Sequence, residues 1–158
     1  MGFISGSGIA SAARTAVLAR SIAALALLAT AATARAADLE IQIQGLRNMN
    51  GIVHLCLSRS PAHFPDCAGD PGMISRTVRA ADAGSIRIHG VPPGDYAVSV
   101  IHDENGDGQL NKMLGIPREG FGFSRNPRIH FGPPGFEACR FPVTGAGARE
   151  VIRMKYLL

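Results

Sequence analysis

The stretch YAVSVI, residues 96–101, decides the fold, because it is the most apolar strand-like segment of the chain. Alternate residues of a strand point to opposite faces. Here both faces carry apolar or small side chains, which are Tyr96, Val98 and Val100 on one face and Ala97, Ser99 and Ile101 on the other. A strand that is apolar on both faces is typical of the centre of a sheet. We therefore expect residues 96–101 to be a central strand.

Further strands are expected before and after this segment in the sequence. They are indicated by alternating apolar and polar residues, or by a short apolar run that has turn residues at both ends. They cover residues 38–46, 52–58, 73–80, 85–91, 136–143 and 149–156, with a short addition at 129–131. The Asn50-Gly51 turn favours a hairpin of the first two. The pattern predicts an all-β, about seven-stranded antiparallel sandwich, immunoglobulin-like or transthyretin-like, with a small barrel as the alternative.

Residues 1–36 have the features of a secretory signal peptide and not of the folded domain. They contain three arginines and no acidic residue, and the apolar run SIAALALLATAATA, residues 21–34, precedes an A-x-A pattern at 34–36. An uncleaved anchor is the alternative, although the run is short for a membrane-spanning helix. We expect residues 37–158 to be a single periplasmic or secreted domain, with no transmembrane segment after cleavage.

Cleavage would also change the charge of the protein. The formal net charge of +4 loses three arginines and becomes +1. The remaining Lys and Arg residues are scattered, so nothing in their distribution indicates nucleic-acid binding. The partners that we expect are a cell-envelope protein or a polysaccharide.

Three cysteines follow the signal peptide: Cys56, Cys67 and Cys139. Export permits disulfides, and the short Pro- and Asp-containing segment between Cys56 and Cys67 favours their pairing. Such a bridge would stabilise the fold by ~3 kcal/mol in the chain-entropy account. Cys139 would then be a buried free thiol, but pairings that include Cys139 stay open.

Directly after the central strand, the sequence HDENGDGQLN, residues 102–111, has the pattern of a calcium loop. The expected oxygen ligands are Asp103, Asn105, Asp107, the carbonyl of Gln109, and Asn111. Gly108 fits the turn position and Leu110 the apolar position that holds the loop to the domain. The twelfth position should be a bidentate Glu and is Leu114, so the loop is incomplete. Either Glu119 supplies the missing carboxylate, or the site binds calcium weakly.

Two other interpretations of this loop stay open. A turn rich in Asp, Asn and Gly can be held by its own hydrogen bonds without a metal. A hydrolase-like enzyme could instead use His102 or Glu119 as acid or base. The five histidines lack the spacing of a known motif, and a zinc or copper site would have to form across strands. A glycine-rich segment, 112–127, follows, and we expect it to be a long functional loop.

Several segments together resemble a family of exported bacterial proteins of unknown function. They are Gly94-Asp95-Tyr96-Ala97, the loop from His102 to Asn111, Gly115-Ile116-Pro117-Arg118-Glu119-Gly120 and Gly122-Phe123-Ser124. The resemblance implies a small exported β-domain and no established activity. The resemblance also ties Glu119, Gly120 and Ser124 to the loop as parts of one motif. We expect His102 and Ser124 to support the loop. The family often has Asp where this chain has Asn111, and the neutral amide lowers the expected calcium affinity.

Overall fold

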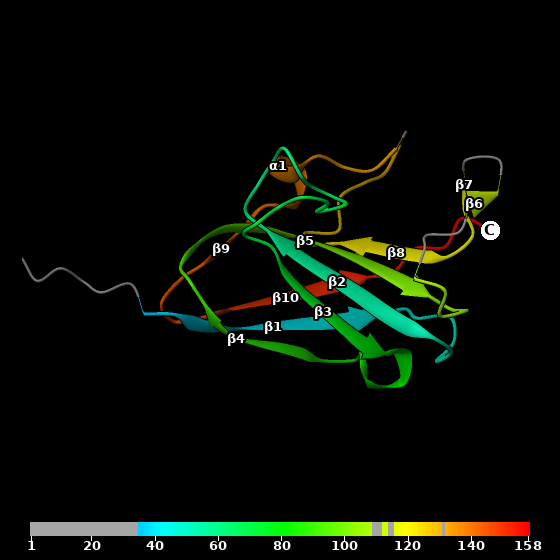
Figure 1. Cartoon of the computed structure of the whole chain (residues 1–158), viewed down its shortest axis with the longest axis horizontal. Coiled ribbons are helices and arrows are strands. Elements are labelled where there is room, and N and C mark those ends of the chain that lie inside the picture. Colours follow the sequence, from blue (N-terminus) through cyan, green and yellow to red (C-terminus); the bar gives the residue numbers. More distant parts are fainter. Residues whose placement is uncertain (1–34, 109–111, 114–115, 131) are drawn as a thin grey trace, which may run out of the picture. The chain divides into compact units, whose positions relative to one another are not determined.

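The computed structural model describes residues 35–108, 112–113, 116–130 and 132–158 and shows two β-sheets (Figure 1). The larger sheet has the order β3 (Ile74–Arg79), β2 (Ile52–Ser58), β5 (Gly94–Asp103) and β8 (Gly120–Phe123), and β9 (Phe141–Val143) pairs with the start of β5. The smaller sheet has the order β10 (Ala148–Arg153), β1 (Ala37–Gln44) and β4 (Ile86–Val91). The prediction of an all-β sandwich is confirmed.

One strand pair departs from the expected antiparallel arrangement. Strands β1 and β10 run parallel, with Leu39 opposite Ala148 and Gln44 opposite Arg153. The remaining elements of the described residues are short: the two-residue strands β6 (Lys112–Met113) and β7 (Ile116–Pro117), the 3-10 helix η1 (Ala80–Asp82) and the helix α1 (Phe136–Cys139). Apart from these two short helical segments, the regular secondary structure of the described residues is β-strand.

Strand β5 is central and is covered on both faces, as its composition predicts. Tyr96, Val98 and Val100 belong to the core between the sheets, with apolar residues of β1, β2, β4 and β10. Ala97 belongs to a second apolar cluster on the opposite face, which contains Phe64, Phe121, Phe123, Phe136 and Cys139. Segment 59–73 and α1 supply Phe64 and Phe136, so chain outside the two sheets covers this face.

The predicted hairpin of residues 38–46 and 52–58 is wrong. Strand β1 pairs with β4 and β10, whereas β2 pairs with β3 and β5, so the connection from Gly45 to Gly51 crosses between the sheets. Period-two alternation shows which face of a strand is buried, but not which strand lies beside it. An Asn-Gly turn was therefore insufficient to identify the pairing.

Three further strand assignments need correction. Residues 120–123 were expected within a loop and form β8, while residues 136–143 contain a helical turn before the three-residue strand β9. In β8, a Cβ on Gly120 would overlap the ring of Tyr156, and one on Gly122 would crowd the side chain of Ile152. These glycines permit close packing of a strand and do not mark a loop. Ile129 and His130 are not in a strand, and Phe131 lies outside the described residues.

Cys56 in β2 and Cys67 form the expected disulfide, and Cys139 is a buried free thiol. Burial raises the pKa of Cys139 to about 11. No helix in the described part of the chain is long and apolar enough to cross a membrane. The predicted signal peptide falls on residues that are not described, except for 35 and 36.

Candidate functional site

The pairing of β5 with β8 brings two distant carboxylates together at one end of the larger sheet. His102 lies opposite Gly120 in this antiparallel pair, so Asp103 and Glu119, each one residue further out, face each other across the strands. One carboxylate oxygen from each of Asp103, Asp107 and Glu119 lies within 4.8 Å of the others. We call these three residues the acidic cluster. Asp103 and Glu119 are buried, and Asp107 is exposed.

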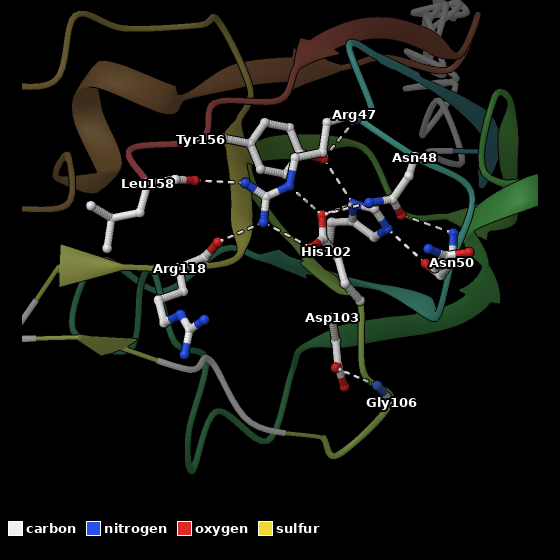
Figure 2. Close-up of polar contacts among 10 residues, drawn as sticks. Arg47, Asn48, Asn50, His102, Asp103, Gly106, Arg118, Tyr156 and Leu158 are labelled. Atoms are coloured by element: carbon white, nitrogen blue, oxygen red, sulfur yellow. Dashed lines mark hydrogen bonds and ion pairs between the residues drawn. The ribbon is translucent and has the colours of Figure 1, made fainter.

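Asp103 holds the start of the loop. Its Oδ1 accepts a hydrogen bond from the Gly106 amide and its Oδ2 one from the Gly108 amide, both at 2.7 Å (Figure 2 draws the first). Gly108 has a φ of 75°, a conformation that favours glycine, at the position where the calcium-loop pattern requires a turn. Burial raises the pKa of Asp103, but these amides and His54 outweigh it, and the net pKa is below the ordinary value.

The other predicted ligands are described only in part. The Asp107 amide donates to Asn105 Oδ1 at 3.1 Å, and Asn105 Nδ2 donates to Asp107 Oδ2 at 3.0 Å. The Asn105 side chain therefore lies against Asp107. Gln109, Leu110 and Asn111 lie outside the described residues.

His102 lies fully buried beneath the loop, with both ring nitrogens in hydrogen bonds. Nε2 is 2.8 Å from the Asn50 carbonyl oxygen, and Nδ1 is 2.7 Å from Tyr156 Oη (Figure 2). Because a carbonyl oxygen only accepts, Nε2 carries the proton, and in the neutral ring Nδ1 accepts from the Tyr156 hydroxyl. His102 thus joins β5 to the β1–β2 connection and to residues after β10.

The sequence pattern did not indicate Arg47, whose side chain binds three other residues at this end of the sheet. Its guanidinium donates to both carboxylate oxygens of Glu104, at 2.6 and 2.8 Å, and to the carbonyls of Arg118 and Leu158. The guanidinium also lies 4.6 Å from the centre of the Tyr156 ring (Figure 2). We call Arg47 with these partners the Arg47 network.

Glu104 belongs to this network and not to the acidic cluster. Asn48 Nδ2 adds a third hydrogen bond to Glu104 Oε1 at 3.1 Å. The hydrogen bonds from Arg47 are the main reason that the pKa of Glu104 is lowered. The Glu104 carboxylate is therefore committed to Arg47, although it lies inside the predicted calcium loop.

His54 is a second residue that sequence reasoning missed. Its Nε2 lies 3.5 Å from Asp103 Oδ2, and its Nδ1 lies 3.2 Å from Thr77 Oγ1. Among the described residues, His54 Nε2 is the buried side-chain polar atom without a hydrogen-bond partner. It faces a member of the acidic cluster from the neighbouring strand β2, a position that only the strand register reveals.

Ser124 lies away from the acidic cluster, just after β8. Its Oγ donates to the Cys139 carbonyl at 2.6 Å and accepts from the Val98 amide at 2.9 Å. Ser124 therefore holds the end of β8 to β5 and α1. Its position beside the loop in sequence does not bring it to the site.

Comparison with known families adds one finding. A family model described as "Uncharacterized protein conserved in bacteria (DUF2141)" matches residues 41–151, which include every described strand that carries the site. No curated protein and no solved structure matches the chain.

Proposed function

The chain belongs to this uncharacterised bacterial family, and from its own geometry we propose that residues 102–124 bind a calcium ion. The observation that carries the proposal is the meeting of two buried carboxylates, Asp103 and Glu119, with a third from Asp107. Buried carboxylates that lie close together repel each other and require compensating charge. A divalent cation supplies that charge.

The donor set fits calcium in its chemistry. Calcium takes six to eight oxygen ligands and tolerates irregular geometry. Asp103, Asp107 and Glu119 would supply carboxylate oxygens, and Glu119 would stand in for the acidic residue that the loop lacks at Leu114. The proposed set is completed by Asn105, the carbonyl of Gln109, and Asn111.

We further propose that the protein is exported and that the bound ion orders residues 102–124 into a surface for a cell-envelope protein or a polysaccharide. The Cys56–Cys67 disulfide is compatible with an oxidising compartment. An ion that joins β5 to the segment before β8 would stiffen the loop between them.

Thermal unfolding of the protein, expressed from the full 158-residue sequence, tests the proposal in calcium and in chelator. For a Kd of about 1 mM and about 10 mM calcium, linkage gives about 1.4 kcal/mol, or a rise in Tm of roughly 5 °C. Glu119→Gln and Asp107→Asn should remove this shift. These variants are preferable to changes at Asp103, which also holds the loop through backbone amides.

Asp82→Asn is the matched control, because Asp82 is an exposed carboxylate that pairs with Arg79 beside η1. It should leave the calcium shift unchanged. Identical melting curves of the unmodified protein in calcium and in chelator would rule out a calcium site of this affinity.

The enzyme alternative has no support in the geometry of the two residues that it requires. His102 is fully buried with both nitrogens occupied, and Glu119 is 4% exposed. Both side chains are buried, whereas the enzyme alternative expects them to reach a substrate.

A further inference from the structure

Arg47 contacts the two residues that are sequence neighbours of the buried carboxylates. Its side chain binds Glu104, which follows Asp103, and the carbonyl of Arg118, which precedes Glu119. Glu104 and Arg118 belong to separate segments of chain, one after β5 and one before β8. A single guanidinium therefore joins the two segments that carry the acidic cluster.

The geometry of these contacts uses the shape of the arginine side chain. Two nitrogens of the planar guanidinium bind the Glu104 carboxylate in parallel, and one of them, Nη2, also reaches the Arg118 carbonyl at 3.0 Å. The third nitrogen, Nη1, binds the carbonyl of Leu158 at 2.6 Å. A lysine ammonium is a single point charge and cannot make this set of contacts at once.

The β1–β2 connection, which carries Arg47, is itself held against the site. A Cβ on Gly51 would overlap the carbonyl oxygen of Asp103, and the Asn50 carbonyl binds His102. The backbone of Asp103 and Glu104 and the ring of His102 thus lie against this connection. Because the backbone that carries Arg47 is held in place, the contacts of its side chain restrain the segment after β5 and the segment before β8.

We propose that Arg47 is a positioning residue that sets the separation of Asp103 and Glu119 and thereby the calcium affinity. This inference rests on the proposed calcium site for its functional consequence. Arg47 itself does not touch the ion. It acts through Glu104 and Arg118, in the way that outer residues of a metal site orient the ligands.

Arg47→Lys is the decisive variant, because it keeps the positive charge beside the site and removes the fork. Calcium affinity, measured by calorimetry, should fall by at least about tenfold, the range seen when residues behind metal ligands are changed. Terbium bound at the same site gives a spectroscopic signature through its luminescence lifetimes in H2O and D2O. Its number of coordinated waters should rise by about one if a carboxylate is displaced.

Arg140→Lys is the matched control. Arg140 is also a partly exposed arginine with two carboxylate partners, Asp95 and Glu137, but it lies at the opposite end of β5. Its replacement should change neither the affinity nor the hydration of terbium. A calcium Kd within twofold of the parent and unchanged hydration in Arg47→Lys would overturn the inference.

Amide hydrogen exchange separates this inference from the proposed function. If the parent protein binds neither calcium nor terbium, the calcium site is wrong, and exchange still tests Arg47. Arg47→Lys should then raise exchange together at Gly106, at Gly108 and in residues 118–120. Exchange that is unchanged, or raised in only one of the two segments, would show that Arg47 does not hold them relative to each other.

Discussion

Two long connections of the larger sheet are held in place by different physical means. Segment 59–73, after β2, is tied by the Cys56–Cys67 disulfide and by Phe64, which packs edge-on against Phe123 and Phe136. Segment 104–119, after β5, is tied in its described parts by the carboxylate of Asp103 and by the Arg47 network. The first, which we call the disulfide-held connection, depends mainly on a covalent bond and apolar burial, and Asp70 adds hydrogen bonds with Ser58 and Gly72. The second, which we call the charge-held connection, depends on charged groups.

This difference determines what each connection responds to. A disulfide and an aromatic cluster are insensitive to pH between neutrality and mild acid, and to divalent cations. Carboxylates that accept hydrogen bonds lose their advantage when they are protonated, and cations compete for their oxygens. The charge-held connection is therefore the one suited to respond to an ion. The disulfide-held connection covers the face of β5 that is turned away from the core between the sheets.

The largest expected effect comes from breaking the disulfide-held connection. The double variant Cys56→Ser, Cys67→Ser should lower the free energy of unfolding by about 3 kcal/mol, because the unfolded chain gains the freedom of an open loop. Urea unfolding monitored by circular dichroism measures the loss. The loss should be the same in calcium and in chelator, since the bridge lies outside the acidic cluster.

The free thiol provides a check on the pairing. Cys139 is fully buried and its pKa is raised to about 11, so the native protein should react slowly with thiol reagents. Unfolded without reductant, the parent protein should expose one reactive thiol, at Cys139. Reaction at Cys56 or Cys67 under these conditions would mean that the bridge is formed differently.

The sequence predicted the disulfide-held side of the molecule better than the charge-held side. Strand β2 has the bounds expected from its alternation, and the disulfide followed from short spacing. Strand β8 was missed because Gly120 and Gly122 are required by contacts with Tyr156 and Ile152, which are 36 and 30 residues away along the chain. Nothing local marks such contacts, and glycine is normally a sign of a loop.

The candidate site shows the same difference between features that local sequence predicts and features that depend on distant residues. Asp103 and Asp107 were predicted as ligands because the calcium-loop spacing is local. Glu119 was predicted because Leu114 leaves that loop without its carboxylate, and the family resemblance favoured the same residue. Arg47 was missed because its partners Glu104, Arg118 and Leu158 are 57, 71 and 111 residues away. Its role depends on a connection that crosses between sheets, where the sequence predicts a hairpin.

A loss of stability of intermediate size is expected when acid protonates Asp103. Its pKa is lowered in the folded protein, so its contribution to stability is present above the unfolded value of about 3.9 and is lost as pH falls through the folded pKa. In chelator at neutral pH, Asp103→Asn should cost about 1–3 kcal/mol, since the amide cannot accept at both positions. The difference between parent and variant should shrink below pH 4, as measured by urea unfolding across pH 2 to 7.

The cysteine variants serve as the comparison for this titration. Their loss of stability should stay constant over the same pH range, because no titrating group takes part in the bridge. If Asp103→Asn also shows a constant difference, the buried carboxylate is not held by hydrogen bonds to its charged form, and the contrast between the two connections fails at that residue.

The smallest effect is expected from a change at Arg118. This variant distinguishes the role of the Arg118 backbone carbonyl from that of the Arg118 side chain. Arg118 contributes its carbonyl to Arg47, and its own side chain is exposed. Arg118→Ala should therefore change the free energy of unfolding by less than about 0.5 kcal/mol, as is usual for surface positions, and should leave calcium affinity within about twofold. A larger loss of calcium affinity would mean that the Arg118 side chain takes part in holding Glu119. The contact from Arg47 to the backbone would then be insufficient to position that carboxylate.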